Sequence, residues 1–167
     1  MNELAGVAGL LSGDNLTFIL KGVSISVAAR DVRLVPSLTR ALGCRLSADG
    51  ARLRIILVRS QSEDVLRDVD AKGILAVVFT EPTTHRTLQI KGMDGRLEPA
   101  VPEDWDCIHF SEQAFAAEIG QLGFDAAFTA RLFHADESDV VVISFTPQAV
   151  FQQTPGPNAG AQLEPLA

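Results

Sequence analysis

Apolar residues alternate with polar or small residues over residues 23–29, which read VSISVAA. A period of two places successive side chains on opposite faces of a sheet, so this pattern predicts a half-buried β-strand. Similar patterns predict five more strands. Their ranges are 38–47, 53–59, 74–79, 87–93 and 139–146. Residues 38–47 would also suit a helix from their Leu and Ala content, but Gly43 and the strand-like neighbours favour a strand.

Helical periodicity is found in other segments. Residues 3–11 predict an N-terminal helix, whereas residues 16–20, LTFIL, suit either the end of a helix or a strand. Residues 63–72 place three apolar side chains on one face and are followed by Gly73, which predicts a helix and its end. Residues 102–131 predict two helices that Gly120 and Gly123 separate.

The turn signals between the strands indicate the fold class. Asp49-Gly50 and Asp94-Gly95 predict tight turns, and strands joined by hairpins favour an antiparallel sheet that closes into a barrel or a sandwich. We expect one domain over residues 1–167. It would carry a helical extension at 1–20, a helical insertion at 102–134 and an irregular Pro/Gly-rich tail at 152–167. Trp105, Phe115, Phe124 and Phe128 of the insertion are expected to pack on the barrel.

Composition excludes several classes of protein. The net charge is −7 and no window is strongly basic, which argues against a nucleic-acid binder. The first apolar run is far shorter than the roughly 20 residues that span a bilayer, so we expect no membrane partner. The two cysteines and three histidines lack metal-site spacing, so no metal is expected. Unpaired cysteines fit a reducing compartment, and we expect the cytoplasm.

Three groups of residues could carry binding chemistry. The first is Arg59, Ser60, Gln61 and Ser62, where a strand ends and a helix begins. Ser60 and Glu63 have the spacing of a capping box, and a helix N-terminus with added hydroxyl and arginine donors suits a phosphate. Plain helix capping would explain the same spacing.

The second group follows the strand at 74–79. Thr84, His85, Arg86, Thr87 and Gln89 supply more donors than a hairpin needs, and Arg86 could pair with a phosphate or a carboxylate. A loop whose threonines cap their own backbone is the alternative.

The third group is Arg40 and Arg45. On a regular strand these positions face opposite sides, so one arginine would line a ligand cleft and the other would serve an interface. Two solvated arginines are the alternative. No nucleophile and base can be paired from spacing, and the catalytic residues stay unknown.

The order of these segments resembles the pyridoxamine 5′-phosphate oxidase-like family of FMN-binding split barrels. The resemblance covers roughly residues 20–155 and is carried by PSLTRALGCRLS, LRIILVRSQSEDVL, ILAVVFTEPTTHRTLQIKG and FQQTPGPNAG. It implies a mainly β, six-stranded antiparallel split barrel with peripheral helices. It also implies a homodimer with FMN at the subunit interface.

The resemblance also implies roles for individual residues. Arg40 falls where the family oxidase has its arginine before the phosphate strand, and Arg45 falls where that oxidase has a lysine. Ser60, Gln61 and Ser62 fall near a Ser-Arg-Lys run, and Arg86 and Thr87 fall near an Arg-Gln pair. The full expected cofactor set is Arg40, Arg45, Arg59, Ser60, Gln61, Ser62, Thr84, His85, Arg86, Thr87 and Gln89.

The tail departs from the family oxidase, because TPGPNAGAQL has no arginine or histidine to grip a substrate phosphate. We therefore expect an FMN-dependent oxidoreductase of unknown substrate, and not pyridoxamine phosphate oxidation. Two alternatives stay open: a non-catalytic flavin- or haem-binding module on the same fold, and a structural dimer that has lost its cofactor.

Overall fold

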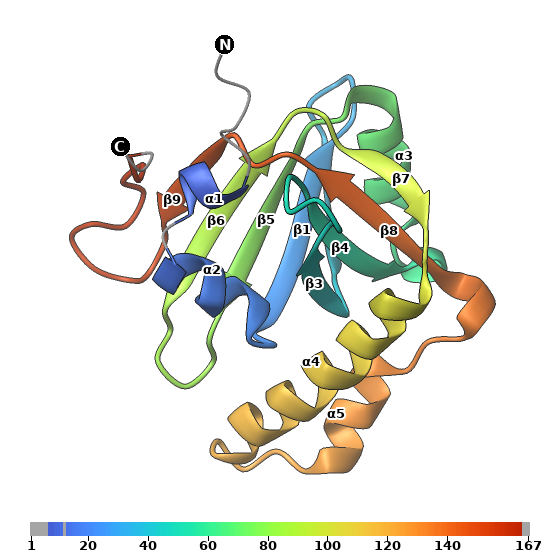
Figure 1. Cartoon of the computed structure of the whole chain (residues 1–167), viewed down its shortest axis with the longest axis vertical. Helices are drawn as coiled ribbons and strands as arrows, with labels where there is room; N and C mark the ends of the chain where they lie inside the picture. Colours follow the sequence, from blue (N-terminus) through green and yellow to red (C-terminus); the bar gives the residue numbers. More distant parts are fainter. Residues whose placement is uncertain (1–6, 12, 165–167) are drawn as a thin grey trace.

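The structure is a computed structural model that describes residues 7–11 and 13–164. Two antiparallel sheets and five α-helices make up most of the described chain (Figure 1). The helices are α1 (Val7–Leu10), α2 (Gly13–Leu20), α3 (Glu63–Lys72), α4 (Pro102–Gly120) and α5 (Ala126–Phe133), with short 3-10 turns η1 (Arg59–Gln61) and η2 (Glu137–Asp139). The strands are β1 (Ser24–Arg30), β2 (Pro36–Arg40), β3 (Gly43–Leu46), β4 (Leu53–Val58), β5 (Leu75–Thr80), β6 (Thr87–Gly92), β7 (Arg96–Pro99), β8 (Val140–Phe145) and β9 (Ala149–Gln152).

The strands form one sheet in the order β2-β1-β5-β6-β9 and another in the order β3-β4-β8-β7. All the pairings are antiparallel, as expected, but the two sheets are not closed into a barrel. The expected number of six strands is wrong for the described chain, which has nine. β7 and β9 are four residues each, too short for their alternation to stand out from a loop.

The predicted strand at 38–47 is two strands that belong to different sheets. The backbone N–H of Ala41 donates to Ile25 O at 3.0 Å, and that of Leu42 donates to Ile56 O at 2.8 Å. Consecutive residues thus bond to different sheets, and the chain passes from one sheet to the other without a loop. This continuous segment joins the two sheets at the end of β2.

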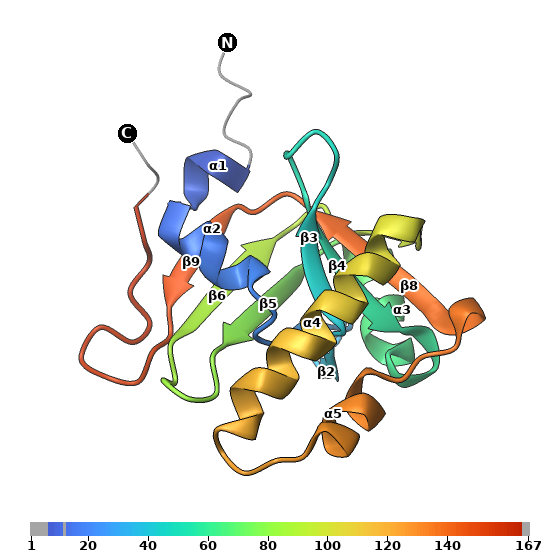
Figure 2. The ribbon, with the colours of Figure 1, turned by 60° about the horizontal axis from the view of Figure 1, so that its bottom comes forward.

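The larger core lies between the sheets. Alternate residues of β1, β5 and β6 point into it, together with Phe18 and Ile19 of α2 and three residues of α3, which are Val65, Leu66 and Val69. A second cluster forms where α4 and α5 cover the other side of β4 and β8, and it includes Val58, Phe115 and Phe133. Figure 2 shows α4 lying across β3 and β4. Every residue of β4 and β8 is buried, because both faces of these strands are covered.

Most of the predicted helices are confirmed. Residues 16–20 are helical within α2, and the predicted helix at 3–11 is seen as α1, with residues 3–6 outside the described chain. α3 ends at Gly73, whose φ of 68° is left-handed, as predicted for a glycine stop. The insertion forms α4 and α5, but the expected packing of Phe124 and Phe128 is wrong. These rings are 49% and 41% exposed.

The tail docks against β9 over its described part. The N–H groups of Gly160 and Leu163 donate to Gln152 O and Val150 O at 2.7 and 2.8 Å. The segment thereby covers the outer edge of β9, which would otherwise present unpaired backbone groups. The expectation of a wholly irregular tail is therefore wrong at two positions, because β9 includes Gln152 and a β-bridge joins Gln162 to Phe151.

Within the described chain, α4 is the longest helix, and no helix has the length and apolar character needed to cross a membrane. Cys44 and Cys107 are both free thiols.

Candidate functional site

The outer face of the five-stranded sheet is the first feature of the site. On each strand it consists of the side chains that alternate with the core residues. None of these outward side chains belongs to either hydrophobic cluster. They include Leu38 and Arg40 of β2, Ser26 and Ala28 of β1, Ala76 and Val78 of β5, Thr87 and Gln89 of β6, and Phe151 of β9. Small and uncharged residues dominate the middle of this face, which leaves room for a flat ligand.

Arg40 ends β2 in an unusual environment. Its guanidinium carbon lies 4.7 Å from the ring centre of Phe133 and 5.1 Å from that of Phe115. Its terminal nitrogens are buried and have no hydrogen-bond partner among the described residues. Burial lowers the pKa of the Arg40 guanidinium below its usual value.

Contacts with two aromatic rings attract a cation but accept few of the five N–H groups of a guanidinium. A buried charge without hydrogen bonds costs free energy, so an unpaired buried arginine calls for a missing partner. An anionic group is the partner that a guanidinium binds best, often through two parallel hydrogen bonds.

The strand register places Arg40 and Gln89 on one row of the outer face. Arg40 is opposite Ser26, Ser26 is opposite Val78, and Val78 is opposite Gln89. Neighbouring strands lie about 4.8 Å apart, so three spacings separate the ends of this row by about 14 Å. Thr87 lies two residues along β6 on the same face, and its hydroxyl donates to Thr80 at 3.1 Å. Arg40 of β2 and the β6 residues Thr87 and Gln89, which are far apart in the sequence, therefore share one surface.

The segment from Arg59 to Ser62 lies at the edge of β2, where it contacts Thr39, the inward-facing neighbour of Arg40. The Thr39 hydroxyl lies 3.2 Å from Gln61 O and 2.9 Å from the Ser62 hydroxyl, which holds β2 against the start of α3. A cleft of about 410 Å³ opens here. Its lining is Pro36, Ser37, Leu38, Ser60, Gln61, Ser62, Glu63, Asp64 and Val65.

The predicted capping box is wrong. Residues Arg59–Gln61 form η1, so the N-cap position of α3 falls at Ser62, and its side chain makes no capping hydrogen bond. The Ser60 hydroxyl donates instead to Asp139 before β8. Glu63 and Asp64 occupy the first turn of α3 and oppose an anion there. Arg59 is exposed and makes no ion pair in the described chain.

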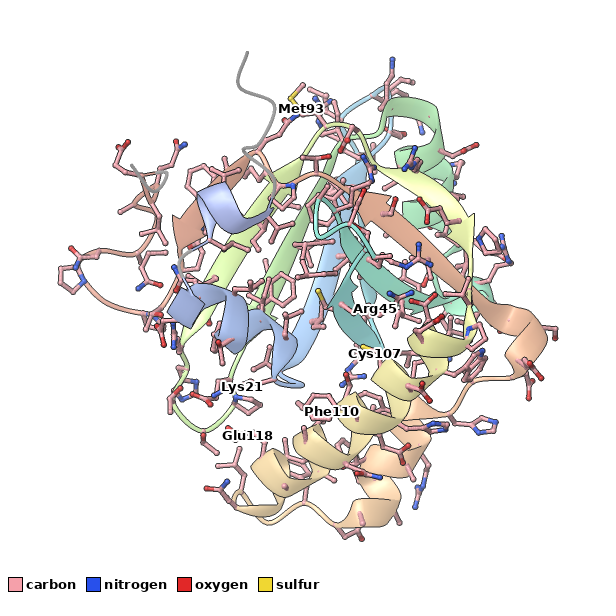
Figure 3. The ribbon with its side chains drawn as sticks, in the orientation of Figure 1. Lys21, Arg45, Met93, Cys107, Phe110 and Glu118 are labelled. Atoms are coloured by element: carbon pink, nitrogen blue, oxygen red, sulfur yellow. The ribbon has the colours of Figure 1, made fainter. Side chains whose placement is uncertain are left out.

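Arg45 does not reach the outer face. It lies on β3 in the other sheet, and its Nε donates to Asp104 at 2.6 Å. Arg54 donates to both oxygens of the same carboxylate, at 3.2 and 2.8 Å. Figure 3 shows Arg45 near the beginning of α4, from which Asp104 comes. Arg45 therefore ties α4 to the four-stranded sheet, and no local sequence pattern indicated that Asp104 is its partner.

Burial alone would raise the pKa of Asp104, but the hydrogen bonds from Arg54 and Arg45 outweigh it and hold the pKa below its usual value. The pKa of Glu98 is lowered in the same way, because interactions with Ser144 and Arg54 outweigh burial. The pKa of Asp94 is also lowered, because hydrogen bonds from Thr146 and Arg52 outweigh burial. These three carboxylates are paired along one face of the four-stranded sheet.

We expect the free energy of unfolding to fall as the pH is lowered below about 5, toward and below the unfolded carboxyl pKa of about 4. The folded pKa values of these acids are depressed, so the unfolded chain binds more protons in this range and acid favours it. Urea unfolding at several pH values between 7 and 3 would measure this. Asp104→Asn should show a shallower loss, and an equally steep loss would contradict the assignment to Asp104.

The hairpin between β5 and β6 holds the remaining predicted residues. Arg86 donates to Asp14 at 2.7 Å and lies 4.3 Å from the ring centre of Phe18, so it docks the hairpin on α2. Thr84 donates to Glu81. His85 is exposed, with a φ of 60°. The structure does not bring Thr84, His85 or Arg86 to Arg40 within one chain.

Neighbouring Thr83 donates to Glu118 of α4, which Figure 3 places beside this hairpin. The donors of the segment thus have structural partners of their own. No group of three histidine, cysteine or acidic side chains suited to a metal ion occurs among the residues the structure describes.

Phe115 and Phe133 were not predicted as part of the site. Their helical spacing indicates only that they are buried, and the ring pair, 5.8 Å apart, forms between two helices. The proximity of Arg40 to these rings depends on how α4 and α5 pack on β2, which no local pattern encodes.

Comparison of sequences gives no match, either to a family model or to a curated protein. Comparison of structures does find matches. HupZ of Group A Streptococcus is 13% identical with a TM-score of 0.51, over 88% of this chain and 98% of that one. An F420 reductase is 16% identical with a TM-score of 0.51, over 80% and 93% of the two chains. A candidate pyridoxamine 5′-phosphate oxidase from Lactobacillus delbrueckii is 11% identical with a TM-score of 0.52, over 87% and 96%.

The structural likeness establishes a shared fold, and at such low sequence identity it establishes nothing finer. The antiparallel sheets, with helices between the strands, match those of the relatives over nearly their whole length. The chain has the split-barrel fold of the pyridoxamine 5′-phosphate oxidase-like proteins.

Proposed function

We propose that the protein binds FMN on the outer face of the five-stranded sheet, as the flavin-dependent oxidoreductase expected from its sequence. The observation that carries this proposal is the buried guanidinium of Arg40, whose terminal nitrogens lack partners, on one row with Gln89. A phosphate would supply the missing partner of Arg40. A candidate oxidase and a reductase among the proteins of the same fold are in keeping with a redox role.

The residues of this face fit the cofactor in part. Arg40 would bind the phosphate, and we propose the exposed Arg59 and Gln61 as further donors to it. Gln89 and Thr87 would hydrogen-bond the flavin ring, and small residues between them would leave space for it. Glu63 and Asp64 favour a phosphate near Arg40 over one at the N-terminus of α3. FMN supplies the electron chemistry when bound, and the chain binds and orients it.

A second copy of the chain completes the proposal. Homodimerisation over the outer face would bury Leu38, which is 72% exposed, and would exclude water from the ligand. It would also allow Thr84, His85 and Arg86 of one subunit to approach the ligand of the other. Free cysteines remain compatible with the expected cytoplasmic location.

Titration with FMN and with riboflavin tests the phosphate assignment. The parent protein is expected to bind FMN more tightly than riboflavin. Arg40→Ala should weaken FMN binding by roughly tenfold or more, since a charge-assisted hydrogen bond contributes about 1.5–3 kcal/mol, and should leave riboflavin binding unchanged. Arg96→Ala is the matched control, because the Arg96 side chain is 62% exposed and lies on β7 of the other sheet.

Equal affinity for the two flavins, or an Arg40→Ala variant with parental FMN affinity, would rule out phosphate recognition by Arg40. Arg45→Ala is expected to reduce stability and leave FMN affinity unchanged, because Arg45 pairs with Asp104. The visible spectrum of the purified protein separates the alternatives: a Soret band would indicate haem, and a colourless protein that ignores added FMN would indicate a dimer without cofactor.

A further inference from the structure

Large exposed apolar side chains gather at two places on the described surface. The first, named here the hairpin end, is the β1–β2 hairpin with the neighbouring β6–β7 turn, and its exposed residues are Val32, Leu34, Val35 and Met93. The second, named the helical tip, is the connection between α4 and α5 with the first turn of α5, and its exposed residues are Leu122, Phe124 and Phe128. Figure 1 shows the hairpin at the top of the molecule and the α4–α5 connection at the bottom.

The hairpin end is grooved and basic. Two adjoining pockets, of about 230 and 330 Å³, share Arg30 and Ile74 in their walls. Lys72 and Asp31 line the smaller pocket, and Lys91 and Leu34 line the larger one, so basic side chains outnumber acidic ones in the two walls. Arg30 and Lys72 make no ion pair within the described ranges. A partner with apolar side chains and negative charge would suit this end.

The helical tip is apolar and belongs to an acidic segment of the chain. Phe124 and Phe128 lie 5.1 Å apart between ring centres and project together as a knob. Residues 102–139, which include α4 and α5, contain nine carboxylates and one arginine, a formal charge of −8. The whole chain carries −7, so the remaining residues have a formal charge of +1 and the excess negative charge belongs to the segment that holds α4 and α5.

The two surfaces lie at opposite ends of one molecule and do not meet within it (Figure 1). We propose that the helical tip of one copy docks on the hairpin end of a second copy, and that the reverse contact forms in the same dimer. This inference rests on the proposed homodimer and adds where its subunits touch. A two-fold axis that relates both contacts would close the assembly, whereas a single head-to-tail contact would continue into rings or filaments.

Cross-linking tests the reciprocal contact. One variant carries Leu34→Cys and a second carries Phe124→Cys, both with Cys107→Ser, and Cys44 stays buried. After subunit exchange and oxidation, the mixture is expected to form a covalent dimer, and each variant alone should form little. Cross-linking of either variant alone as strongly as the mixture, or no cross-link in any sample, would overturn the contact.

Sedimentation equilibrium gives an independent measurement. Phe124→Ser/Phe128→Ser should weaken dimerisation about tenfold or more, equivalent to about 1.4 kcal/mol. Phe110→Ser is the control, because Phe110 is 53% exposed but lies on the side of α4 toward α2 (Figure 3). Thermal melting would show that each variant is folded.

The outcomes separate this inference from the FMN proposal. A protein that stays dimeric and binds FMN after Phe124→Ser/Phe128→Ser has its interface elsewhere, and then the contact fails while FMN binding stands. A parent protein that is monomeric at micromolar concentration overturns the contact whether or not it binds FMN. Monomers that bind anionic lipid vesicles through the hairpin end would show that a membrane surface, and not a second copy, is the partner.

Discussion

Asp104→Asn is expected to lower the free energy of unfolding by about 3–5 kcal/mol, the usual cost of removing one partner from a buried ion pair. The Asp104 side chain is fully buried and lies between Arg45 and Arg54, of which Arg54 is only 9% exposed. Its carboxylate also accepts the backbone N–H of Val101 at 2.9 Å, which fixes the start of α4. An amide would leave the buried guanidinium of Arg54 and the partly buried one of Arg45 facing a neutral side chain. Urea unfolding followed by circular dichroism measures the loss.

Asp106→Asn provides the matched control, since Asp106 lies two residues along α4 and is exposed. Its change should stay within about 0.5 kcal/mol of the parent, as for most surface substitutions. If the two variants lost similar free energy, the network around Asp104 would not be holding α4 to the sheet.

The strands that have one covered face were predictable from sequence. In β1, β5 and β6, alternate residues are buried in the core and the rest are outward, so the period of two appears directly in the sequence. α3 was equally clear, because its apolar face and Gly73 both carry local signals. In each case a short-range preference agrees with the tertiary environment.

The passage of the chain between sheets was not predictable. Residues 38–47 read as one strand, and only the partners of Ala41 and Leu42 divide it. Strand pairing joins residues that are far apart in the sequence, and a single sequence contains no direct signal for it. The short strands β7 and β9 were missed for a related reason, since pairing with β8 and β6 defines them.

The candidate site was predictable by residue type and only in part by position. Arg40 and Gln89 were both expected to bind the cofactor, and the register places them on one row. Arg45 and Arg86 also had the right chemistry, but Asp104 and Asp14 are their partners. An arginine in a sequence supplies a positive charge, but only the fold shows which carboxylate pairs with it.

Gly92→Ala is expected to lower the free energy of unfolding by about 3 kcal/mol, at the upper end of the usual cost of overpacking a core. A Cβ atom at Gly92 would lie 2.4 Å from Cδ2 of Phe145, a distance at which neighbouring groups must move. Phe145 is fully buried on β8, so its ring has little free space to enter. Gly92 thus lets the two sheets approach at the end of β6. Chemical denaturation measures the loss.

Gly120→Ala provides a control of the opposite sign. Gly120 ends α4, and a Cβ atom there would have no heavy atom within 4 Å. Alanine should therefore leave stability unchanged or raise it by up to about 1 kcal/mol, since it restricts the unfolded chain more than glycine does.

The clash at Gly92 can also be tested through its partner. Phe145→Leu destabilises by itself, but combined with Gly92→Ala it should cost clearly less than the sum of the two single losses, because the smaller side chain admits the new methyl group. Strict additivity would show that Gly92→Ala acts through the backbone and not through contact with Phe145.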